Sequence, residues 1–165
     1  MASSSTVISK FYTLETTDDD IAVVTITPTH RKRARGALTE DECFALRDQL
    51  AKLASSYERM LIDLEQVEYV HKFEHVLIAV WKSLGKRIGP LRICSASGYV
   101  KDILVIMRFS KLIGMHDDRE SALLAFRQNT KLETCPDCRG SGQYVGLNCV
   151  EACKKCSGKG KVITW

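Results

Sequence analysis

The sequence predicts an α/β protein with a mainly parallel sheet and about four helices, followed by a small cysteine-rich unit at the C-terminus. Two observations lead to this fold class. Short β-branched and aliphatic runs alternate with stretches of helical periodicity over residues 7–128, the order found in strand–helix–strand units. Five of the seven cysteines then fall within 22 residues. We therefore expect residues 1–6 to be a flexible N-terminus, residues 129–134 a linker and residues 135–165 a second unit.

Composition fits a globular, cytoplasmic protein. Of the 165 residues 45% are hydrophobic and 27% charged, and a chain of this length buries roughly two-thirds of its unfolded surface. We find no secretory signal and no apolar run near the ~18 residues of a membrane span. The net charge is +4, of which residues 135–165 carry +3 from five basic and two acidic residues. We expect neither a membrane nor a nucleic acid as partner.

The N-terminal third contains two expected strands, a basic loop and a helix. Residues 7–14 and the β-branched residues 21–26 are the strands, with an acidic turn between them. Residues 30–36 are rich in Arg and Lys, and we expect a solvated loop there. Thr39 is a good N-cap, and Glu42 three residues later completes a capping box.

The elements after the N-cap alternate between helix and strand. The first helix runs to about residue 55, as shown by apolar residues at helical spacing: Cys43, Leu46, Leu50 and Leu53. The apolar run 60–64 suits a central strand. The rest are a helix over 73–89, a strand over 91–94, a helix over 98–108, a short strand over 112–115 and a last helix capped by Asp117 or Asp118. This order implies right-handed crossovers between parallel strands.

Two matching octets, residues 135–142 and 153–160, carry the clearest chemistry. Each reads Cys-x-x-Cys-x-Gly-x-Gly. Two such pairs of thiolates complete a closed tetrahedral shell for one Zn²⁺, and glycines allow the turns behind each pair. The predicted zinc ligands are Cys135, Cys138, Cys153 and Cys156. We expect the β-prone arms 144–145 and 162–163 to form a small hairpin.

Cys149 is the one cysteine of this segment outside the octets. We interpret it as a small buried apolar residue, although it could also be an alternative ligand or a redox thiol. A redox thiol at this position would fit a redox-sensing protein that releases zinc on oxidation. A third reading is a nucleic-acid-associated zinc protein that uses two basic groups, residues 30–35 and the lysines Lys154, Lys155, Lys159 and Lys161.

The paired octets resemble the cysteine-rich zinc finger of DnaJ-family co-chaperones. That family has four such repeats and two zincs, so the resemblance implies half a finger with one zinc here. It also implies a protein-interaction module, with an unfolded client polypeptide as a partner. The sequence has no His-Pro-Asp tripeptide and no J-domain, so we exclude stimulation of a chaperone ATPase by that route.

Residues 7–128 resemble the STAS domain of anti-sigma factor antagonists. The pattern Asp63-Leu64-x-x-Val67-x-x-Val70, followed at once by a helix, is similar to a strand and loop of that family. The resemblance implies a STAS-like mixed sheet and a regulatory, non-enzymatic protein whose partner is an anti-sigma-type regulator. In the antagonists a serine in the loop is phosphorylated, which disrupts partner binding. Residues 71–74 here contain no hydroxyl group.

We therefore expect a non-enzymatic interaction module that lacks this phosphoswitch. No catalytic residue and no cofactor other than zinc is predicted; no Gly-rich phosphate loop or nucleophile elbow occurs in residues 1–134. The resemblance places the partner surface at the start of the helix after the loop. Its predicted residues are Tyr69, Val70, His71, Lys72, Phe73, Glu74 and His75.

Overall fold

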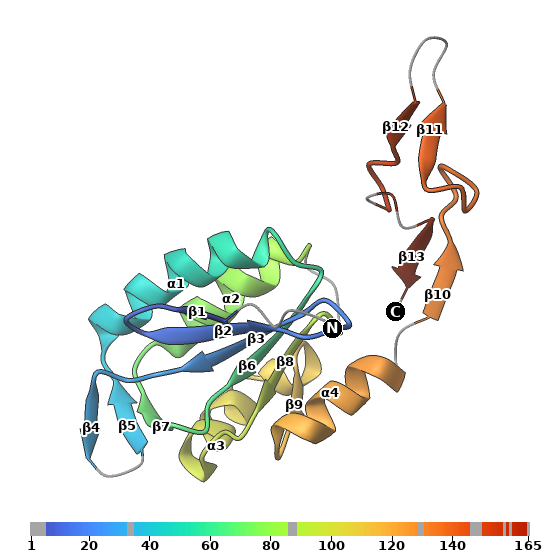
Figure 1. Cartoon of the computed structure of the whole chain (residues 1–165). Helices are drawn as coiled ribbons and strands as arrows, with labels where there is room; N and C mark the ends of the chain where they lie inside the picture. Colours follow the sequence, from blue (N-terminus) through green and yellow to red (C-terminus); the bar gives the residue numbers. More distant parts are fainter. Residues whose placement is uncertain are drawn as a thin grey trace. The chain divides into compact units, whose positions relative to one another are not determined.

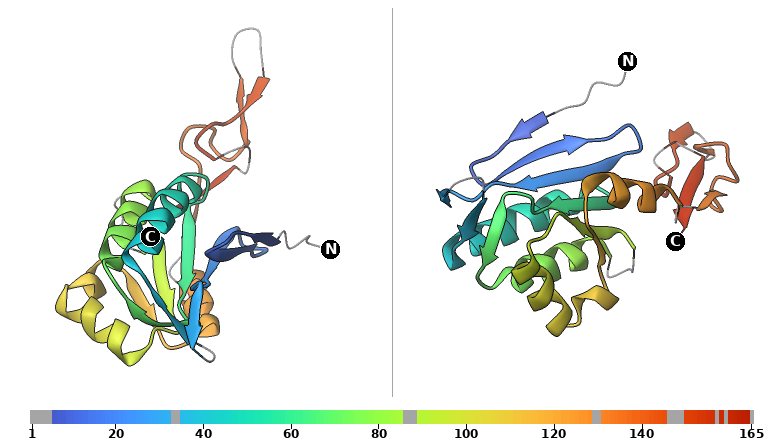
Figure 2. Two further views of the ribbon diagram at one scale, coloured as in Figure 1. Left: turned by 90° about the vertical axis from the view of Figure 1, so that its left-hand side faces the viewer. Right: turned by 90° about the horizontal axis from the view of Figure 1, so that it is seen from below.

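A computed structural model describes residues 6–32, 35–85, 89–128, 131–145, 150–156, 158 and 160–164. The chain divides into two compact units, Met1–Phe126 and Arg127–Trp165, and each is described by itself (Figures 1 and 2). Among the described residues, no helix has the length and apolar character needed to cross a bilayer.

A six-stranded mixed sheet forms the centre of the first unit. Its order is β1 (Thr6–Ile8), β2 (Tyr12–Thr16), β3 (Ile21–Ile26), β6 (Arg59–Asp63), β8 (Leu91–Cys94) and β9 (Gly114–His116). The first three strands are antiparallel neighbours, and β3, β6, β8 and β9 run parallel. The register sets Val24, Ile62 and Ile93 side by side, so three fully apolar side chains meet at the centre of the core.

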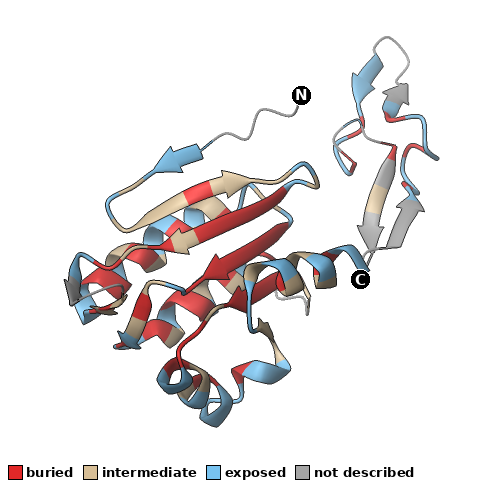
Figure 3. Ribbon diagram, turned by 60° about the horizontal axis from the view of Figure 1, so that its bottom comes forward, coloured by how far each residue is buried: buried red, intermediate tan, exposed pale blue. Residues whose placement is uncertain are grey.

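Helices cover both faces of this sheet. They are α1 (Glu40–Ala54), α2 (Phe73–Ser83), α3 (Gly98–Ile106) and α4 (Arg119–Gln128), with a 3₁₀ turn η1 (Phe109–Lys111) after α3. The first three share one buried cluster with Ile62 and Ile93 (Figure 3). Successive side chains of a strand point to opposite faces, so Arg92 lies on the other face. There its guanidinium lies 4.9 Å from the ring centroid of Phe126 in α4.

The first helix begins and ends where the sequence predicts. The Thr39 hydroxyl accepts a hydrogen bond from the Glu42 backbone N–H at 3.3 Å, and the Glu42 carboxylate accepts one from the Thr39 N–H at 2.8 Å. This reciprocal pair is the capping box expected from the sequence. Cys43, Leu46 and Leu50 of the same helix are buried against the sheet.

The prediction of a solvated loop at residues 30–36 is wrong, because both ends of this segment form strands. β4 (His30–Lys32) pairs with β5 (Arg35–Leu38), and β5 pairs with a further strand, β7 (Val67–Val70), that the sequence did not predict. The Gly36 N–H donates to the Gln66 carbonyl at 2.8 Å. Leu38 is buried with the two valines at the ends of β7, so burial of alternate residues outweighs the charge of the segment.

Four other boundaries differ from prediction. The expected strand 7–14 is two strands, since a turn closed by Ser9 N–H to the Tyr12 carbonyl (2.8 Å) separates β1 from β2. Thr6 opens β1 instead of belonging to a flexible N-terminus, and residues 1–5 lie outside the described residues. Two helices end earlier than expected because Gly85 (φ 84°) and Arg108 (φ 61°) take left-handed conformations that stop them.

Replacing Thr39 by Ala removes a helix cap and leaves the Glu42 N–H without its partner. We expect the free energy of unfolding to fall by about 1 kcal/mol, measured by urea titration. Ser110→Ala, at an exposed residue of η1, is the control and should change stability little. An unchanged midpoint in Thr39→Ala would show that the cap does not stabilise α1.

Glu42 makes stability depend on pH. Burial raises the pKa of this carboxyl, but bonds from Thr29 and Thr39 outweigh it and lower the pKa below 4.5. A group with a depressed folded pKa stabilises above its unfolded pKa, and the contribution is lost as pH falls through the folded value. When the pH is lowered from 7 to about 3, the free energy of unfolding should therefore decrease less for Glu42→Gln than for the unmodified chain. Equal decreases in the two proteins would contradict this.

Candidate metal centre

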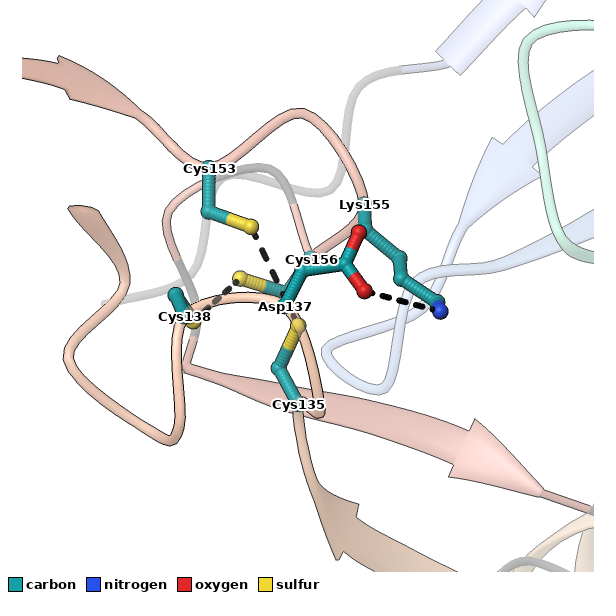
Figure 4. A network of polar contacts seen from close by, with 6 residues as sticks. All are labelled: Cys135, Asp137, Cys138, Cys153, Lys155 and Cys156. Carbon is teal, nitrogen blue, oxygen red and sulfur yellow. Dashed lines mark hydrogen bonds and ion pairs between the residues drawn. The ribbon is translucent and has the colours of Figure 1, made fainter. Parts of the chain in front are cut away.

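Four cysteine side chains of the second unit point toward one another (Figure 4). The Sγ atoms of Cys135, Cys138, Cys153 and Cys156 all lie within 4.8 Å of one another, and all four residues are buried. The Sγ–Sγ distance is 3.8 Å from Cys135 to Cys153 and 3.6 Å from Cys138 to Cys156. A tetrahedral shell with metal–sulfur bonds of about 2.3 Å has sulfur–sulfur edges of about 3.8 Å. The four cysteines could therefore hold a metal ion.

Two antiparallel strand pairs bring the octets together. β10 (Lys131–Thr134) pairs with β13 (Lys161–Thr164), and β11 (Gln143–Val145) pairs with β12 (Val150–Ala152). A small antiparallel hairpin is present, as expected, but the arms 144–145 and 162–163 do not pair with each other: the strand that follows each octet pairs with the strand that precedes the other. The expected linker is also partly strand, because residues 131–134 form β10, whereas residues 129 and 130 lie outside the described residues.

Backbone hydrogen bonds join the two octets directly. The Cys135 N–H donates to the Gly160 carbonyl at 3.0 Å, and the Cys153 N–H donates to the Gly142 carbonyl at 2.8 Å. In each bond the first residue of one octet donates to the last residue of the other. The two octets are thus related by a local two-fold symmetry, which places the first cysteine of one octet beside the first cysteine of the other.

Glycine is required where the octets cross. Gly142 has φ 74°, and a Cβ there would lie 2.3 Å from the carbonyl oxygen of Gly158. Gly160 has φ 72°, and its Cβ would lie 2.4 Å from the carbonyl oxygen of Gly140. Both contacts are far shorter than atoms tolerate, and both conformations are unfavourable for residues with side chains. The glycines of the repeat therefore serve close approach of two backbones as well as turns.

Backbone N–H groups favour negative charge on the sulfurs. Burial raises the pKa of the Cys138 thiol, but N–H groups of Gly142 and Gly140 and the neighbouring Cys156 sulfur outweigh it and lower the pKa to about 6. Burial raises the pKa of Cys156 to about 11, despite the Gly160 N–H at 3.2 Å. Cysteine binds metal as the thiolate, so N–H groups that point at these sulfurs favour the metal-binding form.

An ion pair that the sequence analysis did not single out also crosses between the octets. The Lys155 ammonium lies 3.1 Å from the Asp137 carboxylate (Figure 4). Both occupy the third place of their octet, so aligning the two repeats would have shown opposite charges at matching places. The pKa of Lys155 is raised by Asp137 and, more weakly, by the cysteines Cys135 and Cys153. Half of each side chain is exposed, so the pair adds little stability.

The predicted partner surface of the first unit is only partly accessible. Tyr69 is 50% exposed, and His71, Lys72 and His75 are exposed as well. The structure buries two residues of the predicted set in the core: Val70 and Phe73 are 6% and 1% exposed. These two side chains pack in the apolar core of the first unit.

Two aromatic side chains outside the predicted set extend this surface. Tyr99 of α3 packs edge-to-face on Tyr69 with ring centroids 5.0 Å apart. Phe44 of α1 stacks on His75 at 6.2 Å, with the Arg47 guanidinium 5.4 Å from its centroid. The two ring pairs, Tyr69 with Tyr99 and Phe44 with His75, join residues about 30 apart in the sequence, and no local pattern signals them.

Among the described residues, the other candidates form no second group of potential metal ligands. In the part of the chain that the structure describes, the cysteines of the octets are the single group of three or more potential ligands. Cys149 and Lys159 lie outside the described residues, as do residues 33 and 34 of the basic segment. His30, Lys154 and Lys155 are exposed.

Comparisons with known proteins identify the fold of the first unit. No family model and no curated protein matches the sequence. Among solved structures, an anti-sigma factor antagonist from Mycobacterium paratuberculosis superposes with a TM-score of 0.58 at 20% identity, over 76% of this chain and 97% of its own. A STAS domain protein from Planctomyces limnophilus gives 0.52 at 21% identity, over 70% and 97%. The antagonist SpoIIAA in its unphosphorylated form gives 0.57 at 12% identity, over 71% and 96%.

The first unit has the STAS fold. It holds 126 of 165 residues, about the share of the chain that these structures cover. The predicted fold class, a STAS-like mixed sheet with four helices, is therefore confirmed. The cysteine cluster is compatible with a small metal-binding finger.

Because a Cβ at Gly142 or Gly160 would collide with the other octet, Gly160→Ala should weaken metal binding although no sulfur is changed. We expect a loss of at least about tenfold in zinc affinity, measured by competition with a chromogenic chelator. Gly98→Ala is the matched control, since a Cβ there meets nothing within 4 Å. Equal affinities in the two variants would show that the crossing does not shape the site.

Proposed function

We propose that this chain is a non-enzymatic regulatory protein of the cytoplasm. Its STAS-fold unit binds a protein partner, and its C-terminal unit holds one structural zinc ion through Cys135, Cys138, Cys153 and Cys156. The observation that carries the proposal is the combination of a fold shared with anti-sigma factor antagonists and four converging buried sulfurs.

Zinc is the metal that suits this donor set. Four thiolates in tetrahedral arrangement favour zinc or an iron–sulfur site, and two Cys-x-x-Cys pairs with glycines behind them are typical of structural zinc. Among the described residues, the buried cluster of this unit consists of the four cysteines with Val162 packed against them. A unit of fewer than about 40 residues rarely folds on its own core, so metal binding would supply the folding free energy, on the order of 10 kcal/mol.

The start of α2 supports partner binding that phosphorylation does not control. The N-cap of α2 is Lys72, which has φ 55° and makes no side-chain cap. Its ammonium pairs with the Glu40 carboxylate of α1. A lysine cannot accept a phosphoryl group as a serine does, and its charge is opposite to that of a phosphate. The serine phosphorylation described for the antagonists therefore has no counterpart at this N-cap.

The partner that this unit would fit is an anti-sigma-type regulator. The exposed surface at the start of α2 combines the Tyr69–Tyr99 pair with His71 and the Lys72–Glu40 ion pair. Tyrosines that are half exposed and packed on each other are typical anchors of protein interfaces. An unfolded client polypeptide, which the resemblance of the octets implies, stays a prediction.

Cys138→Ser should remove the zinc and unfold the second unit while the first unit stays folded. Amide NMR spectra of the full chain would then lose the dispersed signals of residues 131–164 and keep those of the STAS-fold unit. Cys149→Ser is the matched control and should retain one zinc per chain. Simultaneous loss of both units would show that they do not fold independently, and retention of zinc by Cys138→Ser would contradict the ligand set.

A double substitution at Tyr69 and Tyr99 to Ala tests the partner surface. We expect it to weaken binding to an anti-sigma-type regulator from the same organism by at least about tenfold, since central aromatic anchors contribute 2 kcal/mol or more. The measurement is isothermal titration calorimetry. Lys52→Ala, exposed near the end of α1, is the control and should bind normally. If no such regulator binds the unmodified chain, this part of the proposal is wrong.

A further inference from the structure

Two close sulfur pairs of the metal site run between the octets. Cys135 faces Cys153 at 3.8 Å and Cys138 faces Cys156 at 3.6 Å, and all four sulfurs lie within 4.8 Å of one another. In each close pair the partners occupy the same place in their octets. This pairing follows from the local two-fold symmetry of the crossing.

Backbone hydrogen bonds between the octets support this pairing of the sulfurs. The hydrogen bonds of Cys135 to Gly160 and of Cys153 to Gly142 join the octets at 3.0 and 2.8 Å. The strand pairs β10–β13 and β11–β12 flank them on both sides. Two sulfurs held this near need only small movements to reach a disulfide bond length of about 2.05 Å.

We propose that hydroperoxides oxidise this site to two specific disulfides, Cys135–Cys153 and Cys138–Cys156, which release the metal and leave the octets joined. The metal release rests on the proposed zinc site; the pairing does not. Disulfides within each Cys-x-x-Cys would instead leave the octets unlinked. The oxidised unit would thus keep its closed form without metal.

Each disulfide forms in two balanced steps. A thiolate attacks the outer oxygen of the hydroperoxide, which breaks the O–O bond, gives a sulfenic acid and releases an alcohol (water from H₂O₂) after one proton is taken up. The facing thiolate then attacks the sulfenic sulfur and expels hydroxide, which takes a proton and leaves as water. Two thiolates lose two electrons and one hydroperoxide gains them, so the site consumes two hydroperoxides.

The solvent exposure of the cysteines sets the order in which the two disulfides form. Cys138 is 8% exposed and Cys135 is 0% exposed, so the pair Cys138–Cys156 should form first. Cys43 and Cys94 of the first unit should stay reduced, because they are 2% and 0% exposed and burial raises the pKa of each thiol to about 12. They serve as internal controls in the same chain.

The test is disulfide mapping of the full chain carrying Cys149→Ser, which removes the one other thiol of the segment. Metal per chain is measured first, two equivalents of H₂O₂ are added, and free thiols are blocked. Digestion with trypsin and an Asp-specific protease separates all four cysteines, since cleavage before Asp137 divides Cys135 from Cys138 and cleavage after Lys154 divides Cys153 from Cys156.

We expect linked peptides for Cys135–Cys153 and Cys138–Cys156 and release of the bound zinc. Linkage within the Cys-x-x-Cys pairs, crossed linkage, or sulfinic acids without disulfides would overturn the proposal. If the chain carries no metal but gives the expected pairs, the zinc proposal fails and the pairing holds. If zinc is present but the disulfide pairs are different, the zinc proposal holds and the pairing proposal fails.

Discussion

The close crossing of the two octets is the constraint on which the second unit depends. Two backbone bonds, from Cys135 to Gly160 and from Cys153 to Gly142, fix the crossing, and glycines occupy the places where any side chain would collide. The four sulfurs converge as a result. Among the residues of this unit whose burial is described, the apolar cluster consists of the four cysteines and Val162, so we expect the unit to depend on what those sulfurs bind.

The first unit is stabilised in a different way. Its apolar core lies between a mixed sheet and three helices, and a fourth helix covers the other face. Such a core needs no metal, so the surface at the start of α2 can be presented by a rigid support. Val70 and Phe73 belong to that support, whereas the exposed aromatic and charged groups around them would contact a partner.

Local signals predicted much of this structure. The capping box of Thr39 and Glu42 placed α1, and the repeated octets identified the converging cysteines. Errors arose where distant segments decide the outcome. The basic segment forms strands because β5 pairs with β7, which is distant in the sequence. The strands that follow each octet pair with strands that precede the other octet. Tyr69 packs on Tyr99, which belongs to a different element. None of these contacts leaves a periodic or motif signature near either partner.

Zinc-edge X-ray absorption on the full chain, with metal content determined on protein purified without added metal, tests the central claim most directly. The account predicts one zinc per chain in a shell of four sulfurs at about 2.3 Å, with no nitrogen or oxygen neighbour. A folded, reduced second unit without metal, or a shell with fewer than four sulfurs, would contradict it.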